Sequence, residues 1–296
     1  MPESFPSRNF AVSRSSVRLD RGAGAVCLVG AGAGEAGLLT LAAREALEKA
    51  DVVLFDDLVD RTVLDLIPAS AARIAVGKRA GRASTPQSEI IATMISASRT
   101  GKSVVRLKGG DPLIFGRGGE EAQALADAGI EVHIVPGMTA ALAAAAAAGI
   151  PLTHRGVSTA VSFVTASTRD GAPPNLAGLA GKGRTLVIYM GRDASDAIVG
   201  ALQQDHVPGA MPVAVIENAG RRHQRLGLTD LRSLAGTIER MAPTGPTLLI
   251  VGEVVAARVA FSSNAVAARQ AEPATPAKQI RIPVYAPVAD FHFAHG

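Results

Sequence analysis

Short apolar runs alternate with amphipathic stretches along the first half of the chain. The runs are bounded by glycine or aspartate, which is typical of buried strands, and the stretches between them have helical periodicity. We predict strands at 26–30, 51–55, 73–76, 103–107 and 131–135, and helices at 39–49, 87–99 and 119–128. Gly101 and Gly129 stand where helix C-caps are expected. This alternation predicts a mostly parallel sheet covered by helices.

A second unit begins near residue 152. Apolar runs predict strands at 160–165, 185–190, 212–217 and 247–252, and helices at 195–204 and 230–240. Residues 224–228 are a candidate for one further strand, in an antiparallel orientation. An alanine-rich helix at 140–148, stopped by Gly149 and Pro151, joins the two units. We therefore expect two α/β domains at 23–148 and 149–257, a disordered arm at 1–22, and an extended or disordered tail at 258–296.

The composition narrows the class of protein. A hydrophobic fraction of 48% and a mean hydropathy of +0.24 favour a well-buried core, but no apolar run reaches the ~18–20 residues that span a membrane. Aromatic residues make up 3% of the chain and the basic residues are dispersed, which argues against a nucleic-acid partner. The net charge of +4 indicates an anionic partner. A single cysteine, Cys27, and the absence of a secretory segment predict a cytoplasmic location. The six histidines are dispersed, so no metal is expected.

Two glycine-rich segments resemble nucleotide-binding motifs but fail them. Residues 30–34 (Gly-Ala-Gly-Ala-Gly) follow a predicted strand, as a dinucleotide fingerprint does, yet Glu35 stands where the third glycine belongs. Residues 101–103 (Gly-Lys-Ser) resemble the end of a P-loop, yet Ser96 stands where its first glycine belongs and the triplet precedes a strand. We therefore disfavour an NAD-dependent oxidoreductase and reject a P-loop NTPase.

A further pair of glycine-rich turns, at 108–112 and 116–121, follows the fourth predicted strand. Turns at the carboxyl ends of adjacent strands form the crevice in which open α/β sheets bind ligands. Asp111 can accept a hydrogen bond from a ligand there, or it can act only as a turn former before Pro112. Glu120 and Glu121 are expected to begin a helix, where negative charge is favourable.

Together these segments resemble the tetrapyrrole methylase family, and within it the uroporphyrinogen-III C-methyltransferases. The likeness covers about residues 25–257. Its most specific part is 105–121, with the run Val-Arg-Leu-Lys-Gly-Gly-Asp-Pro followed by Phe-Gly-Arg-Gly-Gly-Glu-Glu. Residues 135–139 (Val-Pro-Gly-Met-Thr) and 149–155 (Gly-Ile-Pro-Leu-Thr-His-Arg) also match.

The resemblance implies the class III methyltransferase fold, with S-adenosylmethionine in a cleft between two α/β domains, usually in a homodimer. It implies two methylations that convert uroporphyrinogen III through precorrin-1 to precorrin-2, which leads to sirohaem and cobalamin. By the same resemblance, the cofactor-binding residues are Ala33, Gly109, Gly110, Asp111, Ile114, Thr139, Ala140, Met190, Ala219 and Thr247.

The reaction requires a group that stabilises the positive charge that develops on the methylated ring, and a group that accepts a proton. The family's base falls on Asp56 and its acid on Lys78, although Asp56 could be a turn residue and Lys78 a carboxylate clamp. Because the substrate carries eight carboxylates, cations are candidate contacts for it. Those candidates are Arg79, Arg106, Lys108, Arg117, His154 and Arg155, each of which could instead be a solvated charge.

The chain departs from the family pattern mainly on the substrate side. The departures that leave the substrate open are at Asp57, Ala147, Gly156, Val157 and Ser167, and further departures include Ala33 and Glu35 in the first glycine-rich segment. They keep two alternatives open: another methyltransferase of the superfamily, acting on a later corrin precursor or on RNA, and a catalytically weak S-adenosylmethionine-binding homologue.

Overall fold

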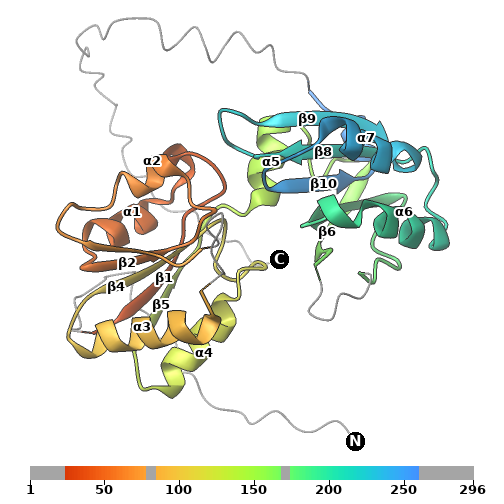
Figure 1. Cartoon of the computed structure of the whole chain (residues 1–296). Coiled ribbons are helices and arrows are strands. Elements are labelled where there is room, and N and C mark those ends of the chain that lie inside the picture. The colour runs from red at the N-terminus through yellow and green to blue at the C-terminus, as the bar shows by residue number, and fades with distance from the viewer. Residues whose placement is uncertain (1–23, 78–84, 168–173, 260–296) are drawn as a thin grey trace, which may run out of the picture. The chain divides into compact units, whose positions relative to one another are not determined.

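The computed structural model describes residues 24–77, 85–167 and 174–259 (Figure 1). Its first sheet has five strands in the order β3-β2-β4-β1-β5, and every strand pair is parallel. These strands are β1 (Val26–Gly30), β2 (Val52–Phe55), β3 (Ala72–Ala75), β4 (Val104–Lys108) and β5 (Val132–Val135). The parallel α/β arrangement predicted for the first half is confirmed.

Helices cover both faces of the first sheet. The chain between its strands forms α1 (Leu41–Glu48), α2 (Arg61–Leu64), α3 (Gln87–Arg99) and α4 (Gly118–Asp127). Leu47 of α1 and Val63 of α2 pack on one face, while Met94 of α3 and Leu125 of α4 pack on the other (Figure 1). Since both faces are covered, β1 and β4 are buried along their whole length, which explains the unbroken apolar run of β1, whereas β4 also carries the charged residues Arg106 and Lys108.

The strand order determines which loops meet at the carboxyl edge of this sheet. β1 and β4 lie side by side, with Gly30 opposite Lys108. β2 flanks β4 and β5 flanks β1. The segments that follow these four strands therefore leave the sheet at one edge.

The second sheet is mixed, in the order β6-β7-β10-β8-β9. Its strands are β6 (Ser158–Thr165), β7 (Gly183–Tyr189), β8 (Pro212–Glu217), β9 (Arg225–Asp230) and β10 (Thr247–Val251). Helices α6 (Ser195–Gln204) and α7 (Leu234–Met241) cover one face, and α5 (Ala140–Ala148) packs on the other. β6 runs parallel to β7, whereas β10 runs antiparallel to both β7 and β8.

Most predicted elements appear within a few residues of their expected bounds. The antiparallel strand expected at 224–228 is confirmed as β9. The helix expected from residue 230 was placed too early, because β9 extends to Asp230 and a 3-10 turn precedes α7. The helix expected from residue 39 begins at Leu41, because the Thr40 hydroxyl caps it by accepting from the Ala43 N–H. Cys27 is buried, and burial raises the pKa of its thiol to about 12.

The predicted division at residue 148 stays a prediction, since contact density groups everything up to Val259 in one unit. Two bonds attach residues of the predicted tail to α5 and its end. Arg258 donates to the Ala148 carbonyl, and the Val259 N–H donates to the Gly149 carbonyl. The predicted arm and the rest of the tail lie outside the described residues. Among the residues that are described, no helix is long and apolar enough to cross a bilayer.

Candidate functional site

The loops after β1 and β4 touch each other at the carboxyl edge of the first sheet. Gly32 and Gly110 exchange two backbone hydrogen bonds, of 3.1 and 2.8 Å. Gly137, after β5, lies so close that a Cβ there would be 2.2 Å from the Gly110 carbonyl oxygen. Glycine is required because three backbone segments meet where a side chain would otherwise lie.

Asp111 fastens this junction. One carboxylate oxygen accepts from the Leu113 N–H at 2.8 Å, and the other accepts from the Gly137 N–H at 3.0 Å. The carboxylate therefore joins the loop after β4 to the loop after β5. The contact predicted between Asp111 and the cofactor stays a prediction beside this structural role.

The second sheet brings three more predicted cofactor residues to one edge. Met190 follows the end of β7 and Ala219 lies two residues after the end of β8. Thr247 begins β10 and lies opposite Glu217. Because β10 is antiparallel to both neighbours, its first residue lies beside their last residues.

Hydrogen bonds join the two edges into one site. The Tyr189 hydroxyl lies 2.6 Å from the Thr139 hydroxyl and accepts from the Ala141 N–H at 3.0 Å. The Tyr189 ring packs against Phe115, with 4.9 Å between ring centroids. Burial raises the pKa of Tyr189 above its ordinary value, so the phenol stays protonated. Loops from β4, β5 and β7 thus meet around one side chain.

Tyr189→Phe is expected to lower the free energy of unfolding by about 1–3 kcal/mol, because the buried Ala141 N–H loses its acceptor. It is also expected to weaken binding of S-adenosylhomocysteine, since the start of α5 becomes less ordered. Urea unfolding and calorimetric titration measure the two effects. Thr139→Ser, which keeps its hydroxyl, is the control. Wild-type stability and affinity in Tyr189→Phe would contradict this role.

Strained backbone and exposed apolar side chains gather at the same loops. Phe115, Met190 and Asn218 all have left-handed φ values, between 52° and 57°. Such strain in non-glycine residues is concentrated at functional sites in proteins. Met190 is 51% exposed and Ile114 is 37% exposed, although both are large and apolar. The site therefore offers an apolar ligand surface beside backbone polar groups.

The turn between β8 and β9 also contacts the first sheet. The Glu35 N–H donates to the Gly220 carbonyl at 3.3 Å, and Arg222 pairs with Glu35 at 3.1 Å. Arg221 donates to the Leu58 carbonyl at 2.6 Å. Leu58 in turn lies against Gly109, where an added Cβ would be 2.8 Å from the Leu58 Cβ. The β8–β9 turn thus holds the loop after β2 close to the loop after β4.

Asp56 lies at the end of a buried network of charges. Arg106 donates to one Asp56 carboxylate oxygen and to Glu121, the latter at 3.2 Å. Lys108 lies 3.1 Å from both Glu121 oxygens, and Gln87 donates to Glu121 at 2.7 Å. Arg106, Lys108 and Glu121 are at most 3% exposed, whereas 27% of the Asp56 side chain is exposed. One oxygen of the Asp56 carboxylate is therefore fixed by Arg106, while part of the side chain remains accessible to solvent.

This network bears on two predicted substrate contacts. Arg106 and Lys108 both point under α4, and both are paired with Glu121. Burial and the nearby Arg106 lower the pKa of Lys108 below its ordinary value, although Glu121 and Asp56 act against this. Both cations are paired with Glu121 inside the protein, so the substrate contacts predicted for them stay predictions beside this structural role. Glu121, expected only to favour the helix start, is a buried counter-charge.

The remaining candidate cations lie in three places. Arg117 is exposed at the start of α4 and pairs with Glu120 at 2.7 Å. His154 and Arg155 are exposed before β6, at the edge of the second sheet opposite to Tyr189. The eight residues of β6 span roughly 25 Å, so the structure does not bring these two to the other site residues. Lys78 and Arg79 lie outside the described residues.

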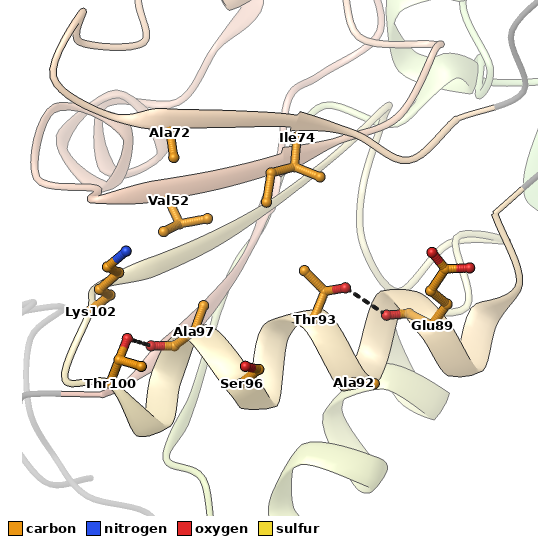
Figure 2. Close-up of a pocket in the computed structure, with 10 residues that line it drawn as sticks. All are labelled: Val52, Ala72, Ile74, Glu89, Ala92, Thr93, Ser96, Ala97, Thr100 and Lys102. Atoms are coloured by element: carbon orange, nitrogen blue, oxygen red, sulfur yellow. Dashed lines mark hydrogen bonds between the residues drawn. The ribbon is translucent and has the colours of Figure 1, made fainter.

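A groove of about 520 Å³ lies apart from these loops, between α3 and the edge strand β3 (Figure 2). Val52 and Ala72, the first residues of β2 and β3, line it, so it lies at the amino-terminal end of the strands. The hydroxyls of Thr93 and Thr100 bond to backbone carbonyls of their own helix (Figure 2). Open α/β sheets bind ligands at the other edge. The groove is therefore not the candidate site.

Three comparisons decide the family. Residues 25–235 match the sequence profile of the Tetrapyrrole (Corrin/Porphyrin) Methylases. The chain belongs to the tetrapyrrole methylase family. A uroporphyrinogen-III C-methyltransferase of Pseudomonas aeruginosa is 49% identical over 231 residues, which cover 78% of this chain and 94% of that protein.

The solved structure of uroporphyrin-III C-methyltransferase from Thermus thermophilus, complexed with S-adenosylhomocysteine, has a similar fold. Its TM-score is 0.69 at 38% identity, over 79% of this tetrapyrrole methylase and all of that chain. Siroheme synthase 2 of Yersinia enterocolitica is 45% identical over 235 residues. The chain spans about half the length of the siroheme synthases it matches. The two-domain α/β fold expected from the sequence is that of this family.

Proposed function

We propose that the protein transfers methyl groups from S-adenosylmethionine to carbon atoms of uroporphyrinogen III, giving precorrin-2 through precorrin-1. The observation that carries the proposal is the meeting of the loops after β1, β4 and β5 with the β7 edge around Tyr189. The named relatives support the reaction and the substrate. A homodimer in the cytoplasm is part of the same proposal.

The residues present fit the cofactor. A Cβ built on Gly110 meets nothing within 4 Å, so a ligand can lie directly against its backbone. Ile114 and Met190 offer exposed apolar surface for an adenine ring, and the Thr139 hydroxyl can bond to a polar group. In the described residues, no group of three or more acidic, histidine or cysteine side chains could hold a metal ion.

The cofactor supplies an activated sulfonium methyl, so the protein mainly has to position the pyrrole carbon. Asp56, fixed by Arg106 and open on its other side, faces outward from the carboxyl edge of the first sheet. Its negative charge can stabilise the cationic ring that methylation creates, and its free oxygen can accept the proton that leaves. Exposed Arg117 is the described candidate best placed to meet a substrate carboxylate.

The test uses the purified full chain with methyl-labelled S-adenosylmethionine and uroporphyrinogen III under anaerobic, reducing conditions. We expect two labelled methyl groups in each product molecule, with the absorption spectrum of a dipyrrocorphin. Cofactor binding without transfer would overturn the substrate assignment and favour a later corrin precursor or a weak homologue. Failure to bind S-adenosylmethionine would overturn the proposal as a whole.

A further inference from the structure

Glu217, the last residue of β8, is a buried carboxylate whose hydrogen bonds to described residues all lie within the second sheet and its loops. It is 1% exposed. One oxygen accepts from the backbone N–H groups of Thr244 and Gly245, each at 2.7 Å. The other accepts from Arg225 at 2.5 Å. Two of these bonds reach the segment that precedes β10, and the third reaches the start of β9, on the other side of β8.

The segment 242–247, here called the β10 entry loop, is bonded to the ends of β8 and β9 and to Arg192. Arg225 also donates to the Ala242 carbonyl at 3.3 Å, and Arg192 donates to the Pro243 carbonyl at 3.2 Å. The Asn218 N–H donates to the Pro246 carbonyl at 2.9 Å. Glu217 is the side chain among these that accepts, and within the described part of the chain its carboxylate is the acceptor for the Thr244 and Gly245 N–H groups.

The entry loop and Glu217 together position two predicted cofactor contacts. Thr247 ends the loop, and its hydroxyl bonds back to the Gly245 carbonyl at 3.1 Å. Gly245 packs so tightly on Asn218 that an added Cβ would lie 2.2 Å from the Asn218 side-chain oxygen. Asn218 has left-handed φ and leads into Ala219. A shift of the loop would therefore move both Thr247 and Ala219.

Resting on the proposed function, we propose that Glu217 is a positioning residue that sets the cofactor-facing backbone at 218–220 and at 247 through the β10 entry loop. Glu217 does not touch the cofactor. It fixes the distance between the end of β8 and the start of β10. Its deprotonated form is favoured: burial alone would raise the pKa of Glu217, but Arg225 and the two N–H groups hold it below its ordinary value. Arg225 and Arg192 are the charged groups that act on it.

Glu217→Gln tests this role, because it keeps the shape but turns an amide N–H₂ toward Arg225. We expect the Kd for S-adenosylhomocysteine to rise about ten- to a hundredfold, the range of a lost hydrogen bond to a charged group. The KM for S-adenosylmethionine should rise in parallel, with kcat at saturating cofactor within about threefold of wild type. Glu239→Gln, an exposed glutamate on α7, is the matched control and should change neither quantity.

Wild-type affinity in Glu217→Gln would overturn the inference. So would a loss of kcat as large as the rise in KM, because that outcome would place Glu217 in the chemistry or in overall stability. If Glu217→Gln does not fold, Arg225→Gln replaces it, because this variant keeps both bonds from the entry loop to Glu217 and removes the bonds of Arg225 to Glu217 and to the Ala242 carbonyl. There the Kd should rise about three- to tenfold, and an unchanged Kd would also overturn the inference. Failure of the unmodified protein to bind S-adenosylhomocysteine would instead defeat the proposed function.

Discussion

Asp56→Asn is expected to lower kcat by about 10²–10⁴-fold, the usual contribution of a positioned acid–base group. The affinity for S-adenosylhomocysteine should stay within about twofold of wild type. Both expectations follow from the position of the side chain. Asp56 follows β2, which β4 separates from β1, and the Asp56 side chain bonds to Arg106 and not to the glycine junction after β1 and β4.

Asparagine is an informative replacement because it keeps a hydrogen-bond acceptor for Arg106. An amide oxygen can still accept from the Arg106 guanidinium, so the buried network below it keeps its hydrogen bond. The amide cannot carry negative charge beside a cationic ring, and it cannot accept the proton that must leave. The variant therefore separates the chemistry of Asp56 from its place in the network.

The neighbouring Asp57 supplies the control. It is exposed, and its side chain makes no hydrogen bond or ion pair with another described residue. Asp57→Asn removes the same charge from the same loop, and kcat should stay within about threefold of wild type. Steady-state methyl transfer and calorimetric titration of both variants measure the difference. Equal losses of kcat in the two variants would show a general charge effect, and wild-type kcat in Asp56→Asn would remove it from the mechanism.

Fold class could be predicted from the sequence because the buried strands are short and mainly apolar and alternate with amphipathic helices. The apolar residues of β1, β4 and β8 were sufficient to predict these strands. The direction of β10 could not be predicted in this way. An apolar run has the same pattern in either direction, and only pairing with β7 and β8 shows that β10 is antiparallel.

The glycine turns of the site could also be predicted, because close backbone approach requires residues without a Cβ. The burial of the two basic residues of β4 against Glu121 could not be predicted. Arg106 and Lys108 alternate along β4, so both point to one face, but the sequence does not show that Glu121 enters that face from α4. From sequence alone, a basic residue that pairs with a distant buried carboxylate cannot be distinguished from a basic residue that binds a ligand.

Two structural residues were missed for a related reason. Tyr189 and Glu217 lie close to predicted cofactor residues, yet the partners of Tyr189 and the backbone N–H groups that donate to Glu217 are 27 to 50 residues away along the chain. The signal that could have indicated Tyr189 is rarity, since the chain has only two tyrosines and one directly precedes a predicted cofactor residue. The signal for Glu217 is its position at the end of an apolar strand. A buried carboxylate there requires a partner, so its presence indicates a buried ion pair or hydrogen bond.

Gly137→Ala is expected to weaken S-adenosylhomocysteine binding by about a hundredfold. The new methyl group would lie 2.2 Å from the Gly110 carbonyl oxygen and 2.7 Å from the Gly30 Cα. Both are backbone atoms of the junction, so neither can move aside by a rotamer change. Overpacking of this kind costs about 1–3 kcal/mol, and each ~1.4 kcal/mol corresponds to a tenfold change in affinity.

The strain in Gly137→Ala can be relieved only by moving one of three segments. Moving the loop after β5 would break the Asp111–Gly137 bond, and moving the loop after β4 would break the Gly32–Gly110 pair. Either shift would displace the open face of Gly110. Gly200→Ala, inside α6 with nothing within 4 Å of the new methyl group, should stabilise the protein by up to about 1 kcal/mol without changing affinity. Calorimetric titration and urea unfolding compare the two alanines. Wild-type affinity in Gly137→Ala would mean that the glycine junction does not form the cofactor site. A methyl group on residue 137 cannot fit between the backbone atoms of Gly30 and Gly110 without displacing at least one of these segments.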